Sequence, residues 1–109
     1  MLREGELEHE AMIARVADLV RRWSLTADEA SRLFPDHDDQ ERERAYRILL
    51  ELDYVMRGLL PSEELADWLR DAGPGGISPL IFLAGGASER SAMLAAARLR
   101  YRQIVGHHI

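Results

Sequence analysis

The chain has 109 residues, a formal net charge of −5 and no cysteine. This length suits one domain with a single core, and the lack of cysteine excludes disulfides and thiolate zinc sites. The acidic balance argues against broad nucleic-acid binding, which needs a basic face. No apolar run approaches a membrane span, and the first residues lack the basic region of a signal peptide, so we expect a cytoplasmic protein without membrane contact.

The first third of the chain predicts two helices. Apolar side chains at helical spacing are Ile13, Val16, Val20 and Trp23. They indicate an amphipathic helix from about residue 7 to residue 23. The segment Thr26-Ala-Asp-Glu29 has the form of a capping box, so a short second helix should run to about Phe34.

The middle of the chain predicts a long amphipathic helix, which we expect to be the central spine of the fold. Asp38 is suited to cap its start. Its apolar residues follow the i, i+3, i+4, i+7 rhythm and are Ala45, Ile48, Leu49, Leu52, Val55, Met56 and Leu59. The turn-forming segment Gly58–Pro61 should end it.

The last part predicts three helices separated by glycine-containing turns. The residues suited to begin them are Ser62 for the first, Ser78 with Pro79 for the second and Ser88 for the third. In the final helix we expect Leu94, Ala97, Tyr101 and Ile104 to lie along one side. Its small residues from Ala92 to Ala97 would pack either against a second copy, giving a homodimer, or within the core. With no strand or repeat evident, the fold class is all-α, a compact bundle of five to six helices.

The order and spacing of these segments resemble the toxin-binding domain of Xre/MbcA/ParS antitoxins. The segments that carry the similarity are Arg47–Met56, Leu60–Leu69, Gly76–Leu80 and Gly86, within about residues 42–102. The family-motif positions, which we expect to be mainly structural, are Trp68, Leu69, Gly76, Ser78, Pro79, Leu80 and Gly86. The resemblance implies an N-terminal helical segment (1–41) similar to a truncated helix-turn-helix and a toxin-binding helical domain (42–109), together in one compact unit.

The N-terminal part of that family is usually a helix-turn-helix, and Trp23–Leu33 resembles its first two helices. The place of the recognition helix is taken by Pro35–Arg44, whose five carboxylates would repel phosphate. We therefore expect weak or absent operator binding. The candidate DNA-contacting residues are Arg42, Arg44 and Arg47, and the alternative for them is a solvated helix face with local ion pairs.

The resemblance implies an antitoxin that binds a RES-domain, NAD-consuming toxin and neutralises it by covering its active site. The alternative function is a DNA-binding regulator of its own operon. The segment from Arg90 onward is locally basic and contains no acidic side chain. Candidate toxin-binding residues are Arg98, Arg102, Gly106, His107, His108 and Ile109. Arg98 and Arg102 share a helix face, whereas a frayed end is the alternative for the last four residues.

Enzyme hypotheses find no support in the sequence. The four histidines are His9, His37, His107 and His108, and none forms a metal-binding pair four residues apart. The chain has no G-x-S-x-G motif and no cysteine nucleophile. We therefore expect a non-enzymatic protein without metal or cofactor, which acts by protein contact.

Overall fold

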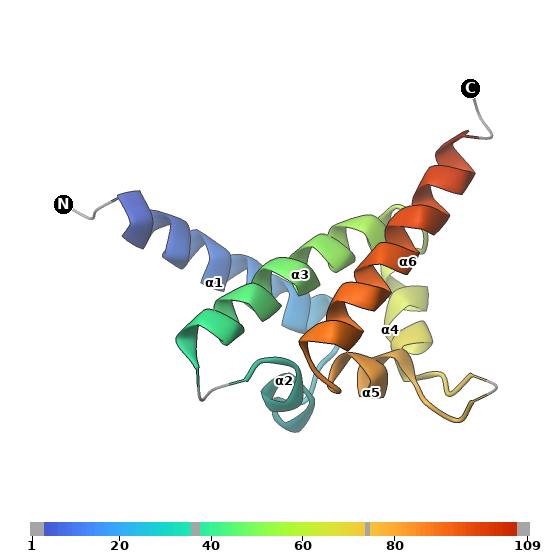
Figure 1. The fold of residues 1–109 in the computed structure, drawn as a ribbon, viewed down its shortest axis with the longest axis horizontal. Helices are drawn as coiled ribbons and strands as arrows, with labels where there is room; N and C mark the ends of the chain where they lie inside the picture. Colours follow the sequence, from blue (N-terminus) through green and yellow to red (C-terminus); the bar gives the residue numbers. More distant parts are fainter. Residues whose placement is uncertain (1–3, 36–37, 74, 107–109) are drawn as a thin grey trace.

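The computed structural model describes residues 4–35, 38–73 and 75–106 (Figure 1). The six helices are α1 (Glu4–Arg22), α2 (Ala27–Leu33), α3 (Asp39–Arg57), α4 (Ser62–Arg70), α5 (Pro79–Leu83) and α6 (Ala87–Gly106). These ranges contain no strand, which confirms the predicted all-α bundle of five to six helices. The division expected after residue 41 falls in the first turn of α3, so this helix belongs to both of the expected segments.

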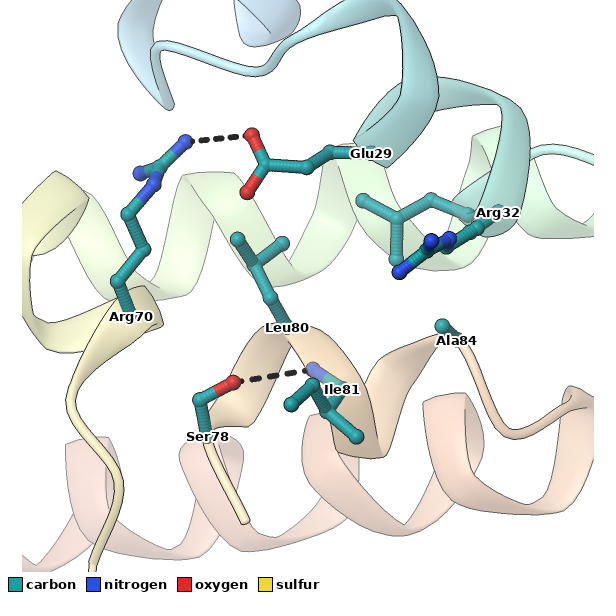
Figure 2. Close-up of a pocket in the computed structure, with 8 residues that line it drawn as sticks. Glu29, Arg32, Arg70, Ser78, Leu80, Ile81 and Ala84 are labelled. Carbon is teal, nitrogen blue, oxygen red and sulfur yellow. Dashed lines mark hydrogen bonds and ion pairs between the residues drawn. The ribbon is translucent and has the colours of Figure 1, made fainter.

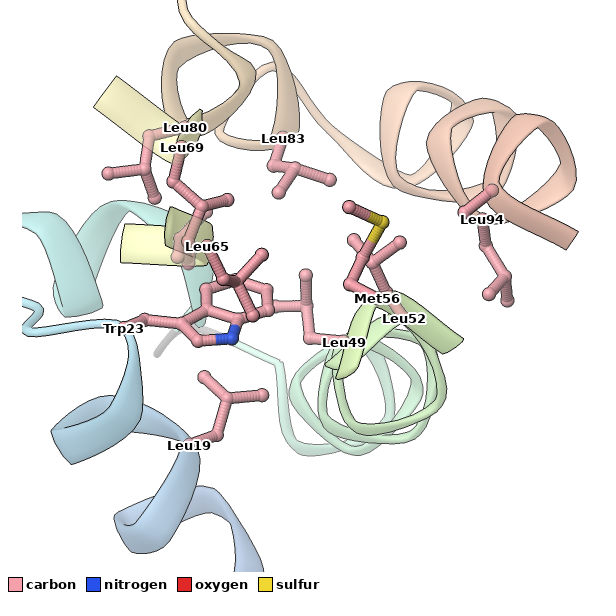
Figure 3. Close-up of a cluster of buried hydrophobic side chains, with 12 residues drawn as sticks. Leu19, Trp23, Leu49, Leu52, Met56, Leu65, Leu69, Leu80, Leu83 and Leu94 are labelled. Atoms are coloured by element: carbon pink, nitrogen blue, oxygen red, sulfur yellow. The ribbon is translucent and has the colours of Figure 1, made fainter. Parts of the chain in front are cut away.

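Helix α3 is the spine of the molecule. It packs against α1 and α4, and its most extensive contact is with α6, which crosses it (Figure 1). The largest side chains that are almost completely buried are Leu19, Trp23, Leu33, Leu49, Leu52, Leu65, Leu69 and Leu83. They belong to one cluster, in which Leu19, Leu49 and Leu65 lie around the indole of Trp23 (Figure 3). Burying each one contributes roughly 1.5–3 kcal/mol, so this junction is the main source of stability.

Helices α2, α3 and α5 each begin after a residue whose side chain caps the first turn, as predicted. Thr26 and Glu29 form the expected capping box, and the Asp38 carboxylate accepts from Gln40 N at 2.8 Å. The caps expected at Ser62 and Ser88 are wrong. Ser62 is already the first residue of α4, and α6 begins at Ala87, so neither serine has the extended backbone from which a hydroxyl reaches the first free N–H groups.

A buried carboxylate joins α1 to α3. Asp53 is 2% exposed, and its Oδ1 accepts from Trp23 Nε1 at 2.9 Å. Its Oδ2 forms an ion pair with the guanidinium of Arg22. The contact satisfies the polar atom of the central tryptophan and neutralises the only buried carboxylate among the described residues.

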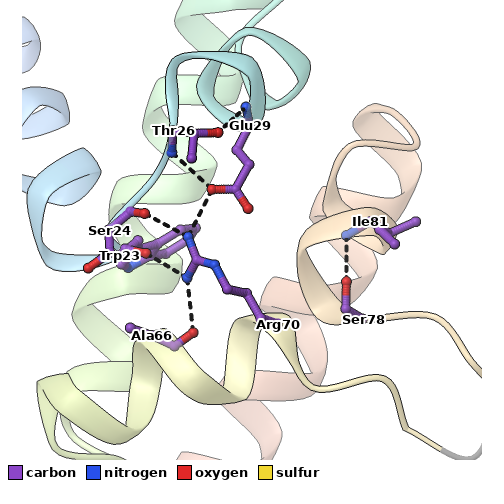
Figure 4. Close-up of polar contacts among 8 residues, drawn as sticks. All are labelled: Trp23, Ser24, Thr26, Glu29, Ala66, Arg70, Ser78 and Ile81. Atoms are coloured by element: carbon purple, nitrogen blue, oxygen red, sulfur yellow. Dashed lines mark hydrogen bonds and ion pairs between the residues drawn. The ribbon is translucent and has the colours of Figure 1, made fainter.

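Arg70 joins α4 to the turn between α1 and α2 (Figure 4). Its guanidinium donates to Trp23 O at 2.9 Å, Ser24 O at 2.7 Å, Ala66 O at 3.1 Å and Glu29 Oε1 at 2.8 Å. The first two acceptors are carbonyls beyond the end of α1, where Ser24 adopts a φ of +53°. One side chain therefore replaces the helix partners that these carbonyls lack.

A second arginine is buried under the start of α6. Arg90 is 6% exposed and donates weakly to Leu33 O at 3.5 Å and Leu83 O at 3.4 Å, at the ends of α2 and α5. Burial lowers the pKa of its guanidinium, while the nearby carboxylates of Glu41 and Glu89 raise it. Its Nε has no hydrogen-bond partner among the described residues. Arg90 thus acts as a shared cap for two short helices.

Two helices extend past the body of the molecule (Figure 1). Every residue from 98 to 106 in α6 is exposed, as is every residue from 8 to 15 in α1 except the half-buried Met12. Leu94 and Ala97 are buried as expected, but Tyr101 is 40% and Ile104 39% exposed. The expected buried side of α6 is therefore incomplete, because α6 extends beyond the end of α3. That end, at Gly58, lies against the Tyr101 ring.

Candidate interaction surface

The C-terminal half of the fold leaves an open hollow between α4 and α6. It has a volume of about 340 Å³. The side chains that define it are Leu60, Trp68, Met93, Ala96, Arg100 and Ile104. We call this hollow the α4–α6 groove. Trp68 forms its wall on α4, and the other wall is one side of α6, so the groove joins segments that are distant in sequence.

A second hollow lies on the other side of the same α6 residues. It has a volume of about 330 Å³ and is lined by Ile77, Phe82, Met93 and Ala96. Ile77 is 56% and Phe82 36% exposed. Because Met93 and Ala96 border both hollows, the two form one continuous surface across α4, α5 and α6, which we call the apolar face.

The chemistry of the apolar face suits a protein partner. Its lining is aliphatic and aromatic, and among the described residues that line the α4–α6 groove Arg100 is the one charged side chain. Exposed apolar surface of this kind marks sites of protein contact, and a groove between two helices accepts the apolar side of a partner helix. A tryptophan beside the groove adds a residue type that often dominates binding energy. The described lining residues offer shape and apolar area rather than groups for bond breaking.

The predicted toxin-binding residues occupy different positions around this surface. The Arg98 guanidinium forms an ion pair with Glu51 of α3, so this side chain points toward α3. Arg102, four residues later, lies on the same side of α6, whereas Arg100 is two residues from both and faces the α4–α6 groove. Gly106 is the exposed last residue of α6. His107, His108 and Ile109 lie outside the described residues.

The family-motif residues mostly shape the backbone and the core. Leu69 and Leu80 are buried, Ser78 Oγ accepts from Ile81 N at 3.3 Å, and Pro79 is the first residue of α5. Gly76 and Gly86 adopt φ values of +73° and +146°, which glycine tolerates and other residues rarely adopt. Trp68 differs from the others because it is half-buried and lines the α4–α6 groove.

Sequence analysis did not select Met93 and Arg100 for this surface, and it named Ala96 only among the small residues from Ala92 to Ala97. Met93, Ala96 and Arg100 recur at i, i+3 and i+7, so they form a stripe of their own on α6. This stripe lies one position before the buried stripe that contains Leu94 and Ala97. The signal was present, but the adjacent stripe of larger apolar side chains obscured it.

The candidate DNA-contacting arginines lie on the first half of α3. Arg42 pairs with Asp39 at 2.5 Å, Arg47 pairs with Glu43 at 2.8 Å, and Arg44 is exposed. These pairs correspond to the solvated face with local ion pairs. Carboxylates in the first turn of α3 also place negative charge at the end of the helix where phosphate would bind.

Another hollow, of about 300 Å³, lies between α2, α4 and α5 (Figure 2). Its polar side chains already have partners within the fold. Glu29 pairs with Arg70 at 2.8 Å, Arg32 pairs with Asp28 at 2.9 Å, and Ser78 caps α5. The hydrogen bonds from Thr26 and Arg70 hold the pKa of Glu29 below its usual range. These groups connect helix ends, so we place the candidate site at the apolar face instead.

Two further properties concern the described residues alone. In the part of the chain that the structure describes, no three histidine or acidic side chains come together as metal ligands. None of the helices in those ranges combines the length and apolarity needed to cross a membrane.

Comparison of the chain with protein-family models, with curated proteins and with solved structures finds no match.

Proposed function

We propose that this chain is a protein-binding antitoxin that neutralises a RES-domain, NAD-consuming toxin by covering its active site. The observation that carries the proposal is the apolar face, which is open along α4, α5 and α6. All of its lining residues except Ile104 fall in the part of the chain, residues 42–102, that resembles the toxin-binding domain of Xre/MbcA/ParS antitoxins. Trp68, a residue of the family motif, stands at its edge.

In this proposal the apolar face supplies the affinity. A partner helix seated in the α4–α6 groove would cover Trp68 and Met93, and burial of apolar area drives such association. The exposed end of α6 carries Arg100, which lines the groove, and Arg102, which lies two residues further along the helix. These arginines suit acidic side chains at the mouth of the toxin cleft, to which long-range attraction would steer the two proteins.

The direct test is co-expression of the chain with the product of the adjacent reading frame, followed by affinity purification of the chain. The expected result is a stable complex, together with suppression of the NAD loss that the neighbour causes when it is expressed alone. A neighbour that consumes NAD equally fast in the presence of the chain contradicts the proposed function, as does the absence of a complex.

A further inference from the structure

A polar hollow lies between α1 and α3, which pack against each other (Figure 1). It has a volume of about 560 Å³, which falls in the roughly 300–1,000 Å³ range of small-ligand sites. We call it the α1–α3 hollow. Among the described residues, its lining shares none with the apolar face and consists of Arg15, Asp18, Arg22, Leu50, Glu51, Asp53, Tyr54 and Arg57.

Positive charge exceeds negative charge around the α1–α3 hollow. Its three carboxylates are each paired with an arginine, in the pairs Asp18–Arg21, Asp53–Arg22 and Glu51–Arg98. Arg15 and Arg57 are exposed and form no ion pair in the part of the chain that the structure describes. The group therefore contains five arginines and three carboxylates, a surplus of two positive charges in a chain of net charge −5. Such a local surplus attracts an anion.

Arg22 is the arginine of this hollow whose position the fold fixes. Its side chain is 28% exposed, and its Nε and Nη2 both donate to the carboxylate of Asp53, which is 2% exposed. Its Nη1 donates to no atom of the described residues. An arginine held on one side by a buried carboxylate loses little freedom when its remaining N–H groups bind an anion. Arg22 is thus a preorganised donor, which Arg15 and Arg57 flank from α1 and α3.

Tyr54 adds an aromatic ring beside these arginines. It is 77% exposed, more than any other large apolar or aromatic side chain in the described ranges. Arg57 follows three residues later, so it lies next to Tyr54 on the surface of α3. An exposed ring of this kind offers a flat surface on which a nucleobase stacks, whichever base it is. The α1–α3 hollow therefore combines groups that bind phosphate with a group that binds a planar ring.

We propose that the α1–α3 hollow binds a nucleoside diphosphate, with its phosphates on the three arginines of the lining and its base stacked on Tyr54. Guanidinium groups bind phosphate oxygens through paired N–H donors. The local surplus of two positive charges suits a diphosphate, whereas the acidic remainder of the chain would repel the further phosphates of a nucleic acid. This inference stands apart from the proposed function, because it uses other residues than the apolar face and concerns the chain without its toxin.

Isothermal titration calorimetry of the full chain with ADP, inorganic pyrophosphate and adenosine, at about 0.15 M salt, tests the proposal. ADP should bind with a dissociation constant below about 1 mM, and adenosine, which lacks phosphate, at least about tenfold more weakly. The variant R15Q/R57Q should weaken the binding of both ADP and pyrophosphate at least about tenfold. Tyr54→Leu should weaken ADP at least about fivefold and leave pyrophosphate unchanged, because only ADP has a base to stack.

A matched control separates the hollow from general charge. The variant R44Q/R47Q removes two exposed arginines of α3 that do not line the hollow, and it should bind ADP like the wild type. All the substituted side chains are exposed, so thermal unfolding by circular dichroism should match the wild type. Absent ADP binding, equal losses in the two double variants, or a Tyr54→Leu chain that loses pyrophosphate as much as ADP would each overturn the proposal. A single-stranded oligonucleotide that binds more tightly than ADP would overturn it in favour of a nucleic-acid site.

Discussion

The surroundings of Trp23 and the outer side of α6 differ in how their apolar residues are covered. Around Trp23, side chains from several helices close the junction, and Asp53 and Arg70 satisfy the polar atoms left at its edges. Along α6, Met93 is half-buried and Ile104 and Val105 are open to solvent. The same helical periodicity therefore yields a sealed junction in one place and an uncovered surface in the other.

This difference separates stability from binding. The junction contains the long-range polar contacts between α1, α3 and α4, so its residues should control unfolding. The apolar face adds exposed area that the fold does not cover, so substitutions there should alter association with little effect on folding. Substitutions in the junction around Trp23 and in the apolar face test whether the first set alters stability and the second alters binding.

The largest expected effect comes from removing the buried carboxylate. Asp53→Ala leaves Trp23 Nε1 and the partly buried Arg22 guanidinium without their acceptor. The free energy of unfolding should fall by about 3–5 kcal/mol, as measured by urea denaturation. Asp53→Asn keeps an acceptor for the indole and should lose less. A loss below about 1 kcal/mol for Asp53→Ala would show that the junction does not depend on this contact.

A smaller loss should follow from Arg70→Ala. This change removes the donor shared by Trp23 O and Ser24 O, but the Arg70 side chain is 36% exposed, so water replaces part of the interaction. We expect a loss of about 1–2 kcal/mol in urea denaturation. Arg70→Lys should recover only part of it, because an ammonium group lacks the planar fork that spans these acceptors. Full recovery by lysine would contradict the bridging role.

The smallest stability effect concerns pH at Glu29. Hydrogen bonds from the Thr26 backbone and from Arg70 hold the pKa of this carboxyl below its ordinary 4.5. The stabilisation by the ionised group is therefore present above pH 4.5 and is lost as the pH falls through the lowered value. The gap in unfolding free energy between wild type and Glu29→Gln should shrink in the same range. A gap that stays constant down to pH 3, or thereabouts, would contradict this assignment.

Local signals in the sequence predicted the helices well. The capping box at Thr26–Glu29, the cap at Asp38 and the Ser78-Pro79 start all depend on residues within one turn, which a sequence displays directly. The same kind of signal was misleading at Ser62 and Ser88, because a serine near a helix start can lie inside the first turn as well as before it.

Contacts between residues that are distant in sequence could not be predicted from these local signals. Asp53 lies in a helix whose apolar neighbours suggest a simple core face, and its partner Trp23 is 30 residues away. Nor does periodicity reveal what covers a stripe. Tyr101 and Ile104 continue the pattern of Leu94 and Ala97, yet α3 ends at Gly58 beside the Tyr101 ring, so these two side chains remain 40% and 39% exposed. The resemblance placed Trp68 among structural residues, and only the fold brings it beside Arg100.

The central claim, that the apolar face holds the protein partner, is tested most directly with two neighbouring alanines of α6. Ala96 lines both hollows of that face, whereas Ala95 is exposed on the next position around the helix. Ala96→Glu and Ala95→Glu should each change the free energy of unfolding by less than about 0.5 kcal/mol.

The measurement is the affinity of each variant for the toxin co-purified with the wild-type chain, by isothermal titration calorimetry. We expect Ala96→Glu to weaken binding at least about tenfold, because it places a carboxylate in the centre of the apolar face, and Ala95→Glu to bind like the wild type. Equal affinities for the two variants would contradict the assignment of the apolar face as the binding site.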